Sequence, residues 1–229
     1  MHNNAFVALL FRQICSMKST QLPYPEASTD MASGTESAWK ALEQLPREQV
    51  CRNAGARCAP AGEAYLLSCF GQEILVCPLR RELTADSPVA SALLGRFRYF
   101  SELAILWYLA GAKEISPSGK LIRPSDLKAG RIFATGSHAL PLDKLAQKYG
   151  NNVDGFLERG RVLGGEDAGL GDASLRLLPF PRVPVVVVLW RECEEFQARA
   201  DLLFDSTCEL HLPQDIVWAT AMLSVLIMM

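Results

Sequence analysis

The chain has 229 residues, a formal net charge of −2, and a composition that is 49% hydrophobic and 21% charged. These proportions are typical of a soluble globular protein and exclude a chain that is disordered throughout. A net charge this close to zero also argues against nucleic-acid binding, which needs a concentrated cationic face. The length suits one domain, which we expect to span residues 33–229.

The seven cysteines predict reduced thiols in the cytoplasm. Their number is odd, their spacing is irregular, and no convincing export signal precedes them. No C-x-x-C motif occurs, which excludes the usual cysteine-ligated zinc ribbon or iron–sulfur cluster. The sequence therefore assigns neither a metal nor another cofactor, and we expect all seven cysteines to be free.

Residues 1–32 are expected to lie outside the folded domain. The apolar run at 5–11 is too short to cross a bilayer and lacks the cationic start of a signal peptide. The stretch that follows is rich in Ser, Thr and Pro and shows no periodicity, which predicts disorder. We expect the natural start to be Met17 or Met31.

Two short helices should open the domain. The spacing from Ser33 to Glu36 fits a capping box, and an amphipathic pattern of apolar residues follows it. A second helix is predicted from Arg47 to Asn53, with Gly55 as its carboxy-terminal cap.

A β-hairpin is predicted over residues 64–79, where two apolar runs flank Gly71-Gln72. A two-residue turn led by glycine suits a type II′ turn. That register opposes Cys69 to Ile74 and puts Cys69 and Cys77 on opposite faces, so these two cysteines should not form a disulfide.

The longest helix is predicted from Pro88 to Ala110. Ser87 supplies a hydroxyl cap, nearly the whole girth is apolar, and Gly111 ends the pattern. A helix this apolar should form the centre of the core. Beyond it, the sequence predicts an extended segment over 116–133 and short helices over 141–149 and 152–161.

The carboxy-terminal third predicts two strands and a final helix. Four consecutive valines lead to Trp190, and the lack of alternation over 185–190 indicates a strand covered on both faces. A second strand is predicted over 200–205, and a helix after Pro213. Residues 216–229 carry no charge but are too few for a typical membrane span, so a buried helix is favoured over a membrane or partner contact. The predicted fold class is α+β, with a mostly helical amino-terminal half packed on a small mixed β-sheet.

The loop GGEDAGLGD at 164–172 matches neither a P-loop nor a dinucleotide-binding fingerprint. Its carboxylates, Glu166, Asp167 and Asp172, would repel a phosphate. Two interpretations remain. The carboxylates could bind a divalent cation, or the loop could be a turn whose glycines supply positive φ while Asp172 caps nearby N–H groups. The turn is favoured.

A second group of acids follows the predicted strands: Glu192, Glu194, Glu195 and Asp205. Burial beside apolar residues would raise the pKa of Glu195 and suit it to general acid or base work. The alternative, which we favour, is a structural ion pair with Arg199, four residues further on a helical face.

The expected site rests on three of these acids: Asp172, Glu195 and Asp205. Two of them adjoin aromatic residues, Phe196 and Phe204, which lower the local dielectric, so paired carboxylates there would need a cation or a shared proton. We expect at least two of the three acids to line one pocket, with Trp190 in its wall and Arg182 as a further candidate. For Trp190 itself, the favoured interpretation is a core residue that closes a buried strand, with ring stacking on a ligand as the alternative.

Other motifs give weaker signals. Cys208 and His211 are metal-ligand types, but zinc requires three or four ligands and no second pair is evident. His138 could serve as a base or a ligand, although a lone loop histidine is more often simply polar surface. No G-x-S-x-G or H-E-x-x-H motif occurs, so the common hydrolase and metalloprotease hypotheses lack support.

Several short motifs stand in a specific order between Trp39 and Leu226. They are the helix end Leu106–Leu109, the pair Gly164-Gly165 with Asp172 downstream, Pro181 to Pro184, Trp190, Glu195-Phe196 and Phe204-Asp205. In this order and spacing the chain resembles the DUF3786 family (domain of unknown function 3786) of bacteria and archaea.

The resemblance implies a soluble protein of anaerobic microbes. Some family members carry an added cysteine-rich iron–sulfur module of the type seen in corrinoid methyl-transfer proteins, and this chain lacks it. The chain also has Glu192-Cys193 where the family pattern tends to read Gly-Asp, so no role for an acid at that place carries over.

Two functional hypotheses follow. The first is an accessory module that binds a small ligand, a cofactor or a partner protein, in a setting of anaerobic redox, iron–sulfur or corrinoid metabolism; this setting rests on family analogy alone. The second is an enzyme that uses Asp172, Glu195 and Asp205 for acid–base or metal-assisted chemistry. An enzyme needs these carboxylates to converge on one pocket, whereas a binding module does not.

Overall fold

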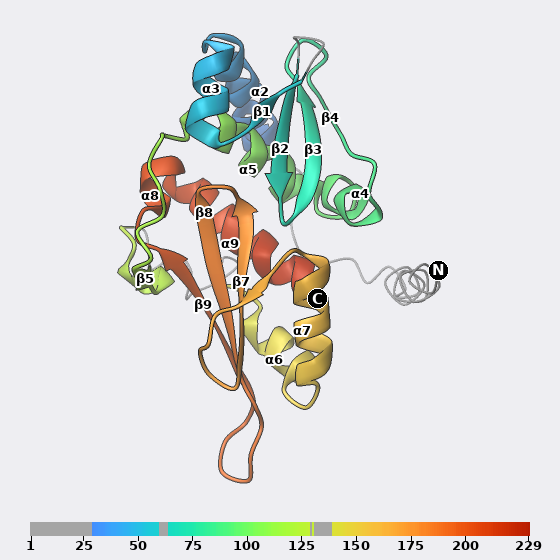
Figure 1. Ribbon diagram of the computed structural model, residues 1–229, viewed down its shortest axis with the longest axis vertical. Coiled ribbons are helices and arrows are strands. Elements are labelled where there is room, and N and C mark those ends of the chain that lie inside the picture. Colours follow the sequence, from blue (N-terminus) through green and yellow to red (C-terminus); the bar gives the residue numbers. More distant parts are fainter. Residues whose placement is uncertain (1–28, 60–63, 129, 131–138) are drawn as a thin grey trace.

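Helices and two β-sheets share one hydrophobic core in the computed structural model, which describes residues 29–59, 64–128, 130 and 139–229 (Figure 1). The α+β fold class is therefore confirmed. All strand pairs are antiparallel and lie in two sheets, whereas the sequence predicted one mixed sheet. Most of the predicted disordered segment 1–32, including Met17, falls outside the described residues, but its last four residues, including Met31, lie in helix α2 (Thr29–Glu43) and are not disordered.

The first helix begins earlier than predicted. Helix α2 (Thr29–Glu43) already contains Ser33, so Ser33 is not its cap. Helix α3 (Arg47–Ala54) ends as predicted at Gly55, which has a left-handed conformation with a φ of 64°. Glycine adopts this conformation without the steric cost of a Cβ.

The first sheet has four strands in chain order: β1 (Arg57–Cys58), β2 (Tyr65–Cys69), β3 (Gln72–Cys77) and β4 (Glu82–Thr84). The predicted hairpin exists, but Cys69 pairs with Gln72 and not with Ile74. Phe70-Gly71 makes the turn, with φ values of 49° and 69°. Phe70 is fully buried, and its N–H donates to the Leu178 carbonyl at 2.8 Å. This contact with the second sheet outweighs the local preference for a turn led by glycine.

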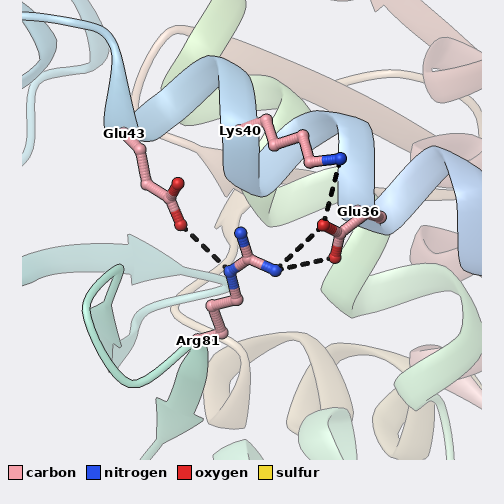
Figure 2. A network of polar contacts seen from close by, with 4 residues as sticks. All are labelled: Glu36, Lys40, Glu43 and Arg81. Atoms are coloured by element: carbon pink, nitrogen blue, oxygen red, sulfur yellow. Dashed lines mark hydrogen bonds and ion pairs between the residues drawn. The ribbon is translucent and has the colours of Figure 1, made fainter.

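Arg81 joins α2 to the turn between β3 and β4 (Figure 2). Its guanidinium donates to both carboxylate oxygens of Glu36, at 3.0 and 2.8 Å, and to Glu43 at 3.0 Å. Lys40 forms a further ion pair with Glu36 at 3.4 Å. The bonds from Arg81 and Lys40 lower the pKa of Glu36. Because the network faces solvent, it adds little to the free energy of unfolding, and its main effect is to orient α2 relative to the β3–β4 turn.

The long helix predicted over 88–110 is two helices, α4 (Pro88–Leu94) and α5 (Arg98–Gly111). Ser87 caps α4, as predicted. Gly95, a poor helix former, breaks the helix with a φ of −99° and a ψ of −85°. The break leaves the Leu93 carbonyl free to accept a hydrogen bond from the Ser101 hydroxyl at 2.7 Å. Helix α5 lies at the centre of the core, in contact with α2, α3, α4 and α9.

Short elements connect the two sheets: β5 (Leu121–Ile122), η1 (Pro124–Asp126), α6 (Leu142–Tyr149) and α7 (Val153–Val162). Both α-helices were predicted, and Gly150 caps α6. The Asn152 side chain caps α7 by accepting the Gly155 N–H. The described part of the segment predicted to be extended carries β5 and η1.

The second sheet has the strand order β5-β9-β8-β7-β6, and its remaining strands are β6 (Glu166–Asp167), β7 (Ala173–Phe180), β8 (Val183–Trp190) and β9 (Arg199–Asp205). Strands β8 and β9 confirm the predictions, and β8 is buried on both faces up to Leu189. Strand β7, which contains Pro179, was not predicted. That proline lies at a shift of register between Leu177 and Phe180, where a missing N–H does not interrupt the ladder.

One face of the second sheet packs against helices. Helix α8 (Cys208–His211) leads into α9 (Gln214–Met228), which runs behind β7 and β8 in Figure 1. Nearly all of α9 from Ile216 onwards is buried, so the predicted core helix is confirmed. No helix in the described ranges is both long and apolar enough to span a membrane.

Cys51 and Cys58 form a disulfide, so the prediction of seven free thiols is wrong. The end of α3 and the start of β1 bring the two Cα atoms to 6.2 Å, within the range that permits a bridge. Their spacing in the sequence gave no sign of this approach. Cys69, Cys77, Cys193 and Cys208 are free, and Cys15 lies outside the described residues.

Candidate functional site

Trp190, at the end of β8, separates two cavities. The larger, here called the loop cavity, has a volume of about 600 Å³ and lies against the β8–β9 loop; its lining is Asp172, Trp190, Arg191, Glu192, Cys193, Phe196, Gln197 and Arg199. The smaller, here called the sheet cavity, has about 460 Å³, and its described lining includes Arg123, Leu140, Leu142, Leu170, Val188, Trp190, Arg199, Asp201 and Leu203. Both volumes are in the usual range of small-molecule sites.

The sheet pattern gathers these side chains on one face. Directly opposed residues of antiparallel strands point to the same side, and Trp190 pairs with Arg199 while Val188 pairs with Asp201. The Trp190 Nε1–H donates to Asp201 Oδ2 at 3.0 Å. The Arg199 guanidinium lies 5.2 Å from the indole centroid and 3.1 Å from Asp201. The ring is therefore held in place, although it is 39% exposed and is not a core residue.

The carboxylates of the two cavities are already engaged by the protein. Their partners are the Arg191 N–H for Asp172 at 2.7 Å, Asn151 for Glu192 at 2.8 Å, and Trp190 for Asp201 at 3.0 Å. Among the described residues, neither Arg123 nor Arg191 has an ion-pair partner within 4.0 Å. The hydrogen bonds to Asp172 and Glu192 come from neutral donors and leave both carboxylates charged. Each cavity thus holds one arginine without an ion-pair partner among the described residues, Arg191 in the loop cavity and Arg123 in the sheet cavity.

The three predicted acids do not meet, so the prediction of a shared pocket is wrong. Only Asp172 lines a cavity with Trp190, while Glu195 is exposed in the β8–β9 loop. The proposed pairing of Glu195 with Arg199 also fails, because that loop is not helical and Arg199 pairs with Asp201. Asp205 lies six residues from Arg199 along β9, about 20 Å at the rise of a strand.

Asp205 has a structural role at the far end of the sheet. It is 1% exposed and accepts hydrogen bonds from Ser118, Gly119 and Thr207 at 2.7–3.0 Å. Burial by itself would raise the pKa of Asp205, but these hydrogen bonds outweigh burial and lower it. The carboxylate thus joins the segment before β5 to the end of β9.

Arg182 lies in the β7–β8 turn, at the opposite end of β8 from Trp190, and belongs to neither cavity. It donates to the carbonyls of Asn53 at 2.6 Å and Arg52 at 2.9 Å. Both carbonyls belong to the last turn of α3, where a cation is favourable. Arg182 therefore ties the second sheet to α3.

The acidic glycine loop contains the short strand β6 between turns, and the favoured interpretation holds for those turns: their glycines have positive φ, and Asp172 accepts a backbone N–H. Gly164, Gly169 and Gly171 have φ values of 67°, 67° and 59°. A Cβ on Gly164 would lie 3.2 Å from Gly71 Cα, and one on Gly165 would lie 2.7 Å from Leu177. No three His, Cys, Asp or Glu side chains gather as a metal site would require, within the ranges that the structure describes.

The remaining motif residues divide between core and surface. Phe204 is fully buried, and Pro181 packs beside Gly55, while Pro184 is buried inside β8. Phe196 is 69% exposed, so it does not shield Glu195 from water.

Cys208 and His211 are both buried on α8. Burial raises the pKa of Cys208 to about 12 and lowers the pKa of His211. His138 lies outside the described residues.

Sequence reasoning missed Arg123, Arg191 and the apolar lining of the sheet cavity. A period of two was present in Val186, Val188 and Trp190, and again in Arg199, Asp201 and Leu203. This period was hard to recognise in β8, because both faces of the strand are covered and its residues are therefore apolar at every position up to Leu189.

No curated protein and no solved structure matches the chain. The family model described as "Domain of unknown function (DUF3786)" matches residues 47–226, which is most of the chain. The resemblance drawn from the order of short motifs covers nearly the same range. The chain therefore belongs to the DUF3786 family.

Proposed function

We propose that this protein is a non-catalytic binding module that holds a small organic anion with an apolar body in the cavities beside Trp190. One observation carries the proposal: Trp190 lines both cavities, and each cavity holds an arginine, Arg191 or Arg123, that has no ion-pair partner within 4.0 Å among the described residues. A guanidinium beside an aromatic wall favours a planar anion, because it can pair with the anionic group while the ring covers the apolar part.

The arrangement of acids supports binding over catalysis. An acid–base enzyme needs two ionisable groups near one reacting atom. Asp172 and Asp205 stand at opposite ends of the second sheet, and Glu195 faces solvent. Trp190, which lines both cavities, is held by Asp201 and Arg199, which suits a ligand that is bound without being converted.

The proposed setting is the cytoplasm of an anaerobic microbe, with the protein as an accessory to redox, iron–sulfur or corrinoid metabolism. The support for this setting is membership of the family.

The test uses 1-naphthoate as the anionic probe and 1-naphthalenemethanol as its neutral match. The chain has four tryptophans, so ¹⁵N-labelled protein gives few indole N–H signals, and Trp190→Phe assigns the one of interest. We expect naphthoate to shift the Trp190 signal at concentrations at least about fivefold lower than the alcohol. Arg191→Gln should remove most of that difference.

Leu79→Ala is the matched control, since Leu79 is 73% exposed and belongs to neither cavity. It should leave both titrations unchanged. Equal binding of the acid and the alcohol by the parent protein, or shifts confined to other tryptophans, would contradict the proposal.

A further inference from the structure

The Cys51–Cys58 disulfide crosses a short surface loop. Cys51 lies in α3, Cys58 lies in β1, and the two are seven positions apart in the sequence. Gly55, in its left-handed conformation, reverses the chain between them. The bridge therefore connects two elements that are already neighbours along the chain.

Both ends of this loop are held without the bridge. At the end of α3, the Tyr108 hydroxyl donates to the Ala54 carbonyl at 2.8 Å, and Arg182 donates to Asn53 at 2.6 Å. On the other side, β1 pairs with β2, and the Arg47 guanidinium donates to the Ala59 carbonyl at 2.7 Å. Opening the bridge should therefore loosen the loop without unfolding the domain.

The bridge is also accessible to an attacking thiol. Cys58 is exposed, and Cys51 is half-buried. Arg52 is exposed, directly follows Cys51 and has no ion-pair partner within 4.0 Å among the described residues, so it attracts a thiolate; Arg57, which directly precedes Cys58, pairs with Glu73. Cys69, Cys77 and Cys208 are buried, and burial raises the pKa of Cys69 and Cys208, which makes them poor competitors in exchange.

We propose that Cys51–Cys58 is a redox-active disulfide that exchanges reversibly with a dithiol while the protein stays folded. A thiolate of the dithiol attacks the exposed Cys58 Sγ, the Sγ–Sγ bond breaks, and Cys51 leaves as a thiolate. The second thiol of the dithiol, as its thiolate, then attacks the dithiol sulfur that is bonded to Cys58 in the mixed disulfide. This step releases Cys58 as a thiolate. Two electrons and the two protons lost by the dithiol thus pass to the cysteine pair, and the dithiol becomes a cyclic disulfide.

The first experiment equilibrates the full chain with mixtures of reduced and oxidised dithiothreitol, followed by alkylation and peptide mass analysis. After reduction, alkylation should modify Cys51 and Cys58 together, and the fraction alkylated should rise with a single midpoint in the ratio of reduced to oxidised dithiothreitol. The far-ultraviolet circular dichroism spectrum should not change. The proposal is overturned if these two thiols become alkylated only in denaturant, if the spectrum is lost on reduction, or if the oxidised protein carries no bridge.

The second experiment tests the direction of attack with oxidised glutathione as the probe. Cys51→Ser leaves the Cys58 thiol, and Cys58→Ser leaves the Cys51 thiol. We expect the Cys58 thiol to form the mixed disulfide at least about tenfold faster, because it is the exposed partner. Equal rates, or a faster Cys51, would overturn the assigned order of attack. Cys193→Ser is the control and should leave the bridge and its midpoint unchanged, since Cys193 lies in the loop cavity.

Discussion

His211 is a buried histidine whose hydrogen bonding is incomplete. It is 1% exposed, and its Nδ1 accepts the Lys113 N–H at 3.4 Å. Among the described residues, its Nε2 has no hydrogen-bond partner. Burial lowers the pKa of His211, the charges of Arg182 and Lys113 act in the same direction, and Asp205 opposes them. The folded protein therefore favours the neutral ring.

This environment makes stability depend on pH. The unfolded chain binds the His211 proton near the ordinary pKa of about 6.5, while the folded protein binds it only at lower pH. The contribution of the neutral ring is thus full above about pH 6.5 and is lost as the pH falls towards the folded pKa. Urea midpoints measured from pH 8 to pH 5 should fall more steeply for the parent than for His211→Gln. Parallel profiles would contradict this account.

At the scale of elements, α5 holds the core together. Leu106 is fully buried at its centre, and the helix contacts α2, α3, α4 and α9. Leu106→Ala should lower the free energy of unfolding by about 2–5 kcal/mol, because it removes apolar contacts and leaves a cavity. The exposed Leu79→Ala should change it by less than about 0.5 kcal/mol. Chemical denaturation of the two variants provides the comparison, and similar losses would mean that α5 is not central.

Local signals predicted most of the helices and two long strands. The cap at Ser87, the left-handed Gly55 and the four valines of β8 are each determined within a few residues. The failures arose where a distant contact decided the local structure. Phe70 moved the hairpin turn because its N–H bonds to Leu178, and β7 accommodates Pro179 at a shift of register.

The candidate site was predicted only in part. Trp190 and Asp172 do share a cavity, because both lie at the same end of β8. Asp205 was misplaced because β8 and β9 are antiparallel, which puts the end of β9, where Asp205 lies, beside the start of β8 and far from Trp190. The sequence did not reveal this pairing. Arg182 directly precedes β8 and Trp190 ends it, so the length of that one strand separates them.

Across the whole molecule, Tyr108 links three separate parts of the chain. Its hydroxyl donates to the Ala54 carbonyl at 2.8 Å and accepts the Arg182 N–H at 3.2 Å, and its ring stacks on Phe180 with centroids 4.4 Å apart. One side chain of α5 thereby connects the end of α3 with the β7–β8 turn of the second sheet.

Tyr108→Phe should destabilise the protein by about 1–3 kcal/mol. The ring still fills its space, but a buried carbonyl and a partly buried N–H both lose their partner. Thermal or urea unfolding would measure the loss. Tyr99→Phe is the control, since that ring is only partly buried, and it should have a smaller effect. If Tyr108→Phe left the free energy of unfolding unchanged, water or a small backbone shift must replace the hydrogen bonds of the hydroxyl.

The close approach of Gly71 and Gly164 sets a limit on how this fold can vary. Where two side chains meet, a loss of volume on one side can be compensated by a gain on the other. Here the β2–β3 turn and the end of α7 meet main chain to main chain. The first carbon added to either residue would lie 3.2 Å from the opposite Cα, and both residues have left-handed backbone. A side chain at either position would therefore strain left-handed backbone and push the facing main chain back by a few tenths of an ångström, so glycine is favoured on both sides of this contact between the two sheets.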